Sequence, residues 1–283
     1  MVHDLLISSR RNPLVRRLRS LATRSGRDLE GVVLLEGSHL LHELTKRGLA
    51  PTEVIATDHW LDRHSVLVDE LPKGTPIRRV TEEVLRAALS TVNPDGVACL
   101  CPLSCFPSPP SRAGFHLVLD RIQDPGNLGT LLRTALAADV EAVWIGAGAD
   151  PLSPKVLRAS AGTLFQLAHQ RFGPDGEAAV HQMERKLQEL AGQGIQVVAT
   201  LVPEAQGVLQ PFPYWDLDWT RPTALVLGTE GAGLHPRLQA CCTHAVTLPH
   251  SPRVESLNVA AAAVPLLLER RRATMAPTTQ QSG

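Results

Sequence analysis

The chain has 283 residues and a formal net charge of zero, with 28 Lys and Arg against 28 Asp and Glu. This length allows one large or two modest domains. The balanced charge excludes a protein that binds polyanions over its whole surface, so any nucleic-acid partner must be recognised by local patches. The five cysteines lack zinc spacing, and no apolar run approaches the ~20 residues of a membrane span. We therefore expect free thiols, no metal site, no membrane partner and a cytoplasmic location.

An arginine-rich segment lies near the start of the chain. Residues 10–27 contain seven arginines and no acid. Asn12 followed by Pro13 is typical of a helix start, and apolar residues such as Leu14 and Leu18 recur at helical spacing. The sequence predicts an amphipathic helix with a cationic exterior. Such an exterior fits an ordinary solvated face as well as contact with phosphate, so both interpretations stay open.

Short strands and helices alternate through the first hundred residues. Thr81 is a candidate cap, and Glu82 and Glu83 suit the positive end of a helix dipole. The predicted strands are residues 32–36, 53–57, 77–80 and 97–103, and the predicted helices are residues 37–47 and 81–89. We expect a small α/β domain over residues 1–105, ended by a proline-rich linker at residues 106–114.

The remaining chain predicts a second α/β domain over residues 115–272, followed by a disordered tail at residues 273–283. The predicted strands are residues 115–119, 143–145, 195–200, 224–227 and 244–248. The predicted helices are residues 128–138, a helix from Ser153-Pro154 toward residue 161, residues 177–191 and residues 256–271. Strands that alternate with helices indicate a mainly parallel sheet covered on both faces.

Three polar stretches of this domain are candidates for a site. The first, residues 124–129, joins a strand to a helix that carries Arg133, a junction that suits anions. Taken alone, it is more typical of a simple Pro-, Gly- and Asn-rich turn with a surface arginine. The second, residues 225–234, is an apolar strand that ends in a glycine-rich turn with one acid, Glu230. The third, residues 248–258, places Ser256 and Asn258 at the head of an alanine-rich helix. A simple cap would explain Ser256 but not Asn258.

Three common classes of site do not fit these stretches. Residues 121–126 lack the G-x-G-x-x-G of a dinucleotide fold, and residues 228–233 lack the lysine and hydroxyl residue of a P-loop. The chain also has no G-x-S-x-G nucleophile elbow.

In order and spacing, the three stretches resemble the SpoU-type ribose 2′-O-methyltransferases of the SPOUT superfamily. The matching residues are Asp124-Pro125-x-Asn127-x-Gly129-x-x-x-Arg133, then Leu227-Gly228-Thr229-Glu230-Gly231-x-Gly233-Leu234, then Leu248-Pro249 through Glu255-Ser256-Leu257-Asn258-Val259. The resemblance covers residues 115–272. The N-terminal part resembles, more loosely, a ribosomal-protein-like RNA-binding domain that is often fused to such enzymes.

The resemblance implies S-adenosylmethionine as methyl donor, a C-terminal deep trefoil knot and a homodimer formed through the knotted domain. By motif position, the donor-binding residues are Thr200, Gly228, Leu248 and Leu257. The catalytic set is Asn127, Arg133, Glu230, Ser256 and Asn258. The arginines expected to bind RNA are Arg10, Arg11, Arg16, Arg17 and Arg19.

Arginine has a pKa above about 12, so Arg133 is a poor base for a ribose hydroxyl. We expect it to stabilise the developing alkoxide and to hold a neighbouring phosphate. The chain departs from the family at His250 and Pro252, where methionine and glycine are usual. Because proline fixes φ and removes an N–H, we expect the loop near Leu248 to differ in geometry from that of the family.

The resemblance therefore predicts an enzyme that methylates a ribose 2′-hydroxyl in structured RNA. Ribosomal RNA is favoured over transfer RNA because of the type of N-terminal domain, which is an argument by analogy. Two other classes stay open: an RNA-binding or ribosome assembly factor without catalysis, and a methyltransferase acting on a base or a protein.

Overall fold

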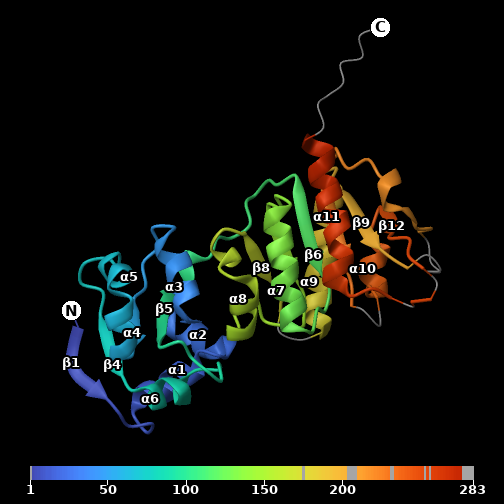
Figure 1. The fold of residues 1–283 in the computed structure, drawn as a ribbon. Helices are drawn as coiled ribbons and strands as arrows, with labels where there is room; N and C mark the ends of the chain where they lie inside the picture. The colour runs from blue at the N-terminus through green and yellow to red at the C-terminus, as the bar shows by residue number, and fades with distance from the viewer. Residues whose placement is uncertain are drawn as a thin grey trace. The chain divides into compact units, whose positions relative to one another are not determined.

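The computed structural model describes residues 2–173, 176–202, 209–229, 233–251, 253–254 and 256–275, with only the backbone described for residues 2–4. The chain forms two compact units (Figure 1). The first comprises Met1–Pro107 together with Asp150–Gln166, and the second comprises Ser108–Ala149 and Leu167–Gly283. The segment Asp150–Gln166, which the sequence pattern placed in the second domain, thus packs with the N-terminal unit.

The first unit contains a five-stranded mixed sheet in the order β1-β4-β3-β5-β2. Its strands are β1 (Val2–Ile7), β2 (Val32–Glu36), β3 (Glu53–Ala56), β4 (Ile77–Val80) and β5 (Val97–Pro102). β4 is parallel to β1 and β3, whereas β5 is antiparallel to β3 and β2. β1, which has six residues, was not predicted, and its partner β4 lies far along the chain.

Seven α-helices of the described chain belong to this unit, and most begin at a side-chain cap. They are α1 (Pro13–Ser20), α2 (Arg24–Glu30), α3 (Ser38–Thr45), α4 (Asp58–Arg63), α5 (Ser65–Asp69), α6 (Glu82–Ala88) and α8 (Pro154–Ser160). The predicted caps Asn12, Thr81 and Ser153 are confirmed, since each accepts a backbone N–H of the first turn. The predicted apolar stripe on α1 is also confirmed, because Leu14 and Leu18 are buried.

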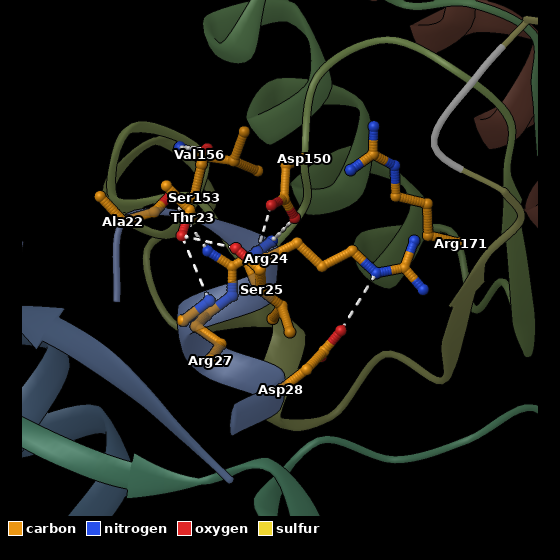
Figure 2. Close-up of polar contacts among 12 residues, drawn as sticks. Ala22, Thr23, Arg24, Ser25, Arg27, Asp28, Asp150, Ser153, Val156 and Arg171 are labelled. Atoms are coloured by element: carbon orange, nitrogen blue, oxygen red, sulfur yellow. Dashed lines mark hydrogen bonds and ion pairs between the residues drawn. The ribbon is translucent and has the colours of Figure 1, made fainter. Parts of the chain in front are cut away.

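Two ion pairs, each with one buried partner, hold the Asp150–Gln166 segment within the first unit. Arg27, only 2% exposed, forms an ion pair with Asp150 and also donates to the carbonyl oxygens of Leu21 and Ala22 (Figure 2). Arg158 of α8 forms an ion pair with the buried Glu36 at the end of β2. A buried charge is costly unless it is paired and hydrogen-bonded, so these pairs specify where the segment packs.

The second unit contains a seven-stranded parallel sheet in the order β10-β12-β9-β11-β6-β7-β8. Its strands are β6 (Phe115–Leu119), β7 (Ala142–Ile145), β8 (His169–Arg171), β9 (Gln196–Thr200), β10 (Phe212–Pro213), β11 (Thr223–Leu227) and β12 (His244–Thr247). The prediction of a mainly parallel sheet is confirmed. β8 and β10 were missed, since strands of two or three residues carry little periodicity.

Helices cover both faces of this sheet. They are α7 (Pro125–Ala137), α9 (Gly176–Gly192), α10 (Pro236–Ala240) and α11 (Val259–Met275). Figure 1 shows α7 and α11 side by side on one face and α9 behind the strands. Alternate strand residues such as Val197 and Val226 are buried with Met183 and Leu187 of α9, as the period of two in a strand requires. No helix in the described part of the chain is long and apolar enough to cross a membrane.

Candidate active site

A cavity of about 320 Å³ lies where β9, β11 and β12 end and α11 begins. These three strands are neighbours in the parallel sheet, so their carboxyl ends meet at one edge, which is where open α/β sheets bind ligands. The cavity is lined by Thr200, Leu201, Val202, Leu227, Gly228, Thr229, Gly233, Leu234, Gln239, Thr247, Leu248, His250, Ser256, Leu257, Val259 and Ala262. All four residues predicted to bind the donor are among them.

The turn after β11 forms one wall of the cavity. Thr229 and Gly233 exchange two backbone hydrogen bonds, at 3.1 and 3.0 Å. A Cβ added to Gly228 would lie 2.4 Å from the carbonyl carbon and oxygen of Gly233. Glycine is therefore needed at position 228 for the turn to close, apart from any contact with a ligand. Glu230, predicted to be catalytic, lies outside the described residues.

A buried carboxylate at the end of β6 anchors the other side of this turn. Asp120 is fully buried, accepts the backbone N–H of His235 at 2.9 Å and pairs with Arg121. Arg121 in turn donates to the carbonyl oxygen of Gly233 at 3.4 Å. These contacts fix the segment that follows Gly233, a role for Asp120 that the motif pattern did not reveal.

Two threonine hydroxyls of the cavity wall have no hydrogen-bond partner among the described residues. Thr200 ends β9, Thr247 ends β12, and the Oγ1 atoms of both are buried without a partner in the described part of the chain. Leaving a buried hydroxyl unpaired costs about 1–3 kcal/mol, so such groups are normally satisfied by a neighbour or a ligand. Thr247 was missed from the sequence, although it directly precedes the predicted Leu248.

The loop after β12 is stabilised by His250, one of the two residues at which this chain departs from the family pattern. His250 Nδ1 lies 2.8 Å from the carbonyl oxygen of Leu248, so a proton on Nδ1 would be donated to that oxygen. His250 also lines the cavity. It thus helps to set the shape of the loop. Pro252 lies outside the described residues.

The start of α11 differs from the prediction. The helix begins at Val259, and Asn258 is its cap: Oδ1 of Asn258 accepts the backbone N–H of Ala260 at 3.0 Å and of Ala261 at 3.1 Å. The prediction that capping explains Ser256 but not Asn258 is wrong, since the cap lies two residues later. Ser256 is exposed at the cavity rim.

The start of α7 also differs, and it brings a second asparagine to the same place. Asp124 accepts the backbone N–H of Asn127 at 2.7 Å, so the helix begins at Pro125 rather than near Leu128. Asn127 therefore lies in the first turn. Its Oδ1 accepts a hydrogen bond from Nδ2 of Asn258 at 3.0 Å. Two predicted catalytic residues, 131 positions apart, are in direct contact.

Arg133 lies apart from the cavity. It is exposed on α7, does not line the cavity, and forms no ion pair or hydrogen bond with any residue of the described ranges. In this single chain, α7 therefore presents a free guanidinium that does not meet Asn127, Asn258 or the cavity-lining threonines.

The arginines predicted to bind RNA have different surroundings in the first unit. Arg17 forms ion pairs with Glu30 and Glu53, both at 2.9 Å, and so is used by the fold itself. Arg10, Arg11 and Arg16 are exposed. Arg19 is exposed too, with its Nε bonded to the carbonyl oxygen of Ala87 at 2.6 Å.

Comparison with known families agrees with the resemblance that the three motifs carry. The model of the SpoU rRNA methylase family matches residues 114–267, more than half of the chain. The chain belongs to the SpoU rRNA methylase family. The model of an MRM3-like substrate-binding domain matches residues 12–99. The family and the two-part organisation of this SpoU methylase thus match the resemblance found in the sequence.

Several related proteins align with this SpoU methylase over nearly its whole length. An uncharacterized tRNA/rRNA methyltransferase of Synechocystis sp. is 42% identical over 96% of both chains. The 23S rRNA (guanosine(2553)-2′-O)-methyltransferase RlmP of Bacillus subtilis is 29% identical over 94% of this chain and 98% of its own. The AdoMet-bound methyltransferase AviRb of Streptomyces viridochromogenes has a TM-score of 0.73 at 26% identity, with 92% and 98% of the two chains covered.

The cavity suits S-adenosylmethionine. Its volume lies within the range of about 300–1,000 Å³ that is usual for small-molecule sites. Leu227, Leu234 and Leu257 supply apolar walls, while backbone groups of the turn at Gly228 and of the loop at Leu248 supply polar edges. The unpartnered hydroxyls of Thr200 and Thr247 would gain partners from a polar ligand.

Proposed function

We propose that this protein transfers a methyl group from S-adenosylmethionine to a ribose 2′-hydroxyl of ribosomal RNA. The observation that carries the proposal is the contact between Asn127 and Asn258. Asn258 lies between Leu257 and Val259, which line a cavity that also holds two hydroxyls without a partner among the described residues. Family membership and relatives that modify 23S rRNA support the substrate. A substrate-binding domain like that of MRM3 favours ribosomal over transfer RNA. The bacterial relatives support a cytoplasmic location.

In the proposed site, Thr200, Gly228, Thr247, Leu248 and Leu257 hold the donor. When bound, S-adenosylmethionine supplies an activated methyl group on a sulfonium. The chain then has to orient the ribose oxygen and assist the loss of its proton, which are positioning and electrostatic tasks. Leucine and valine side chains of the cavity wall give the donor an apolar surround.

The paired asparagines orient the sugar in this proposal. Asn258 is held at both ends, because its oxygen caps α11 and its amide nitrogen binds Asn127. A side chain fixed in this way loses little entropy when a substrate hydroxyl approaches. Ser256, exposed at the rim, offers a further hydrogen bond to the RNA, and Glu230 is proposed to act with them because of its motif position.

Arg133 is proposed to stabilise the developing alkoxide and to hold a neighbouring phosphate of the RNA. Its exposed guanidinium is free of protein acids among the residues described, so its fork is open to an anion. Arg133 lies away from the cavity of its own chain. The reacting ribose and its phosphate must therefore be brought to Arg133 by the bound RNA, or Arg133 must act at the cavity of a second copy of the protein.

A homodimer through the second unit is part of this proposal. Residues 259–268 of α11 are all apolar, and Val264 and Leu268 are 37% and 41% exposed. A helix of this kind is normally buried, so the exposed side of α11, beside α7, is proposed to meet the same face of a second copy. The trefoil knot is likewise proposed. It is supported by the return of the chain from β11 across to β12, on the other side of β9.

Transfer of labelled methyl to unmodified ribosomal and transfer RNA pools tests the proposed function. We expect label in the ribosomal pool, lost in an Arg133→Ala variant that still binds the donor. Label confined to transfer RNA would overturn the substrate assignment. A protein that binds donor and RNA but transfers nothing would be a binding factor instead.

A further inference from the structure

A second polar cavity of about 450 Å³ lies in the first unit, and three arginines converge on it. Its lining consists of Arg10, Arg19, Glu83, Arg86 and Ala87. Arg10 precedes α1, Arg19 lies in the last turn of α1, and Arg86 lies in the last turn of α6. Figure 1 shows α1 and α6 side by side. The packing of these two helices therefore creates a cationic hollow that no single segment of the sequence contains.

The fold holds these side chains in place. Leu14 and Leu18 of α1 are buried in one core with Val84 and Leu85 of α6, which fixes the spacing of the two helices. Arg19 is tied to α6 by the bond from its Nε to the carbonyl oxygen of Ala87, and its two terminal nitrogens form no hydrogen bond in the described structure. An arginine that is held through Nε alone can still bind a ligand with both terminal nitrogens of its guanidinium group.

The charges of this hollow are not balanced by the protein. Arg10, Arg19 and Arg86 form no ion pair within the described residues, and Glu83 is the one acid in the lining. Elsewhere in the unit, carboxylates hold arginines firmly: Glu53 binds Arg17 and Arg78, Asp58 binds Arg79, and Glu36 binds Arg158. Three guanidinium groups around one hollow repel each other, and an anion between them would remove that repulsion.

From this arrangement we infer that Arg10, Arg19 and Arg86 form a phosphate-binding subsite for the backbone of the substrate RNA. The inference rests on the proposed function for the identity of the polyanion and extends it by assigning Arg86. The guanidinium fork matches phosphate geometry bidentately, and each neutralised phosphate releases condensed counterions. The chain has no net charge, so such a local cluster is what it needs to hold RNA.

If these residues bind phosphate, removing a positive or a negative charge from the hollow should change the affinity for RNA in opposite directions. Arg86→Ala should weaken binding of an unmodified 23S rRNA transcript by roughly three- to tenfold at about 0.1 M salt. The negative slope of log K against log salt should become shallower by about 1, because one phosphate contact is lost. Glu83→Gln, in the same hollow, should tighten binding, because the one opposing charge is removed. Arg63→Ala takes the same charge from an exposed position on α4, outside the hollow, and serves as the matched control.

Filter binding over a salt series, with circular dichroism melts of each variant, provides the test. Arg86→Ala and Glu83→Gln moving affinity in opposite directions, with Arg63→Ala closer to wild type, would support the subsite. Equal affinities and slopes for wild type and Arg86→Ala, with both folded, would overturn it.

Methyl transfer and donor binding, measured on the same samples, separate this inference from the proposed function. If the wild type methylates rRNA and Arg86→Ala binds RNA as tightly as the wild type, the proposed function stands and the subsite is overturned. If RNA binding depends on these charges but no methyl group is transferred, the subsite stands and the proposed function is overturned. Wild type that does not bind the transcript at all would overturn both.

Discussion

The side-chain nitrogen of Asn258 donates to Oδ1 of Asn127 at 3.0 Å, which joins the cap of α11 to the first turn of α7. The same Asn258 uses its oxygen to accept two backbone N–H groups of α11. One residue thus has two separable tasks, capping through oxygen and bridging through nitrogen. Asparagine and aspartate cap helices about equally well, but aspartate has no donor.

Replacing Asn258 with aspartate should therefore separate stability from turnover. We expect Asn258→Asp to keep the free energy of unfolding within about 0.5 kcal/mol of wild type, whereas Asn258→Ala should lose about 1 kcal/mol with the cap. Both should lose at least about tenfold in methyl transfer, since the bridge to Asn127 is gone in each. Urea denaturation and single-turnover assays measure the two effects. Full activity in the aspartate variant would show that the bridge does not matter for the reaction.

The unpartnered hydroxyl of Thr247 predicts opposite effects on donor affinity and on the stability of the free protein. Thr247→Val keeps the shape and removes a buried hydroxyl that has no partner among the described residues. We expect the free protein to be as stable as wild type or slightly more stable. Affinity for S-adenosylmethionine should fall about fivefold, because one hydrogen bond contributes about 1 kcal/mol. Calorimetric titration and thermal melts check the pair, and unchanged affinity would place the hydroxyl outside the donor site.

Arg133 should affect turnover without affecting donor binding, because it lies outside the cavity. Arg133→Ala is expected to reduce turnover on the order of 100-fold at saturating donor, the cost of removing one group that stabilises developing negative charge. Arg133→Lys should recover part of this loss through charge alone, but not the bidentate fork. Donor titration of the same samples is the control. Weaker donor binding in Arg133→Ala would mean that the arginine acts on the cavity after all.

His116 predicts how stability depends on pH. The side chain is 3% exposed, and burial lowers the pKa of His116 below its ordinary value. Its Nδ1 accepts the indole N–H of Trp144 at 3.1 Å, so a second proton on the ring would break that bond. The folded state favours neutral histidine, while the unfolded chain takes up a proton near pH 6.5. The contribution of His116 to the free energy of unfolding is therefore fully present above about pH 6.5. It is lost as the pH falls toward the lowered pKa of His116 in the folded state.

Urea denaturation at pH 7.5 and pH 5.5 tests this. Wild type should lose more stability between the two pH values than His116→Gln, whose side chain cannot be protonated in that range. The other histidines are common to both proteins and cancel in the difference. An equal loss in both proteins would assign the pH dependence to other groups.

The sequence predicted well what depends on neighbouring residues. The pairs Asn12-Pro13 and Ser153-Pro154 marked two helix starts correctly, because a cap and a first-turn proline act locally. The same signal also holds at Asp124-Pro125, where the helix begins instead of at the predicted Leu128, although Gly126 and Asn127 have low helix propensity. There the cap outweighed propensity.

What the sequence did not reveal depends on distant contacts. The ion pair of Arg27 with Asp150 joins residues 123 positions apart and places α8 with the N-terminal unit. Arg17 belongs to the same basic run as Arg19. Only the fold shows that Arg17 forms ion pairs with Glu30 and Glu53. Arg86 lies far from that run and meets it only through the packing of α6 on α1. Charge patterns locate a basic segment, but tertiary packing decides which of its arginines are free.

The chemical position of the transferred methyl group is the most direct test of ribose methylation. Ribosomal RNA labelled by the protein from methyl-labelled S-adenosylmethionine is hydrolysed in alkali, which cleaves only next to a free 2′-hydroxyl. We predict that the label appears in alkali-stable dinucleotides and, after full enzymatic digestion, in 2′-O-methylnucleosides. Label in alkali-released mononucleotides would show methylation of a base and would contradict the account.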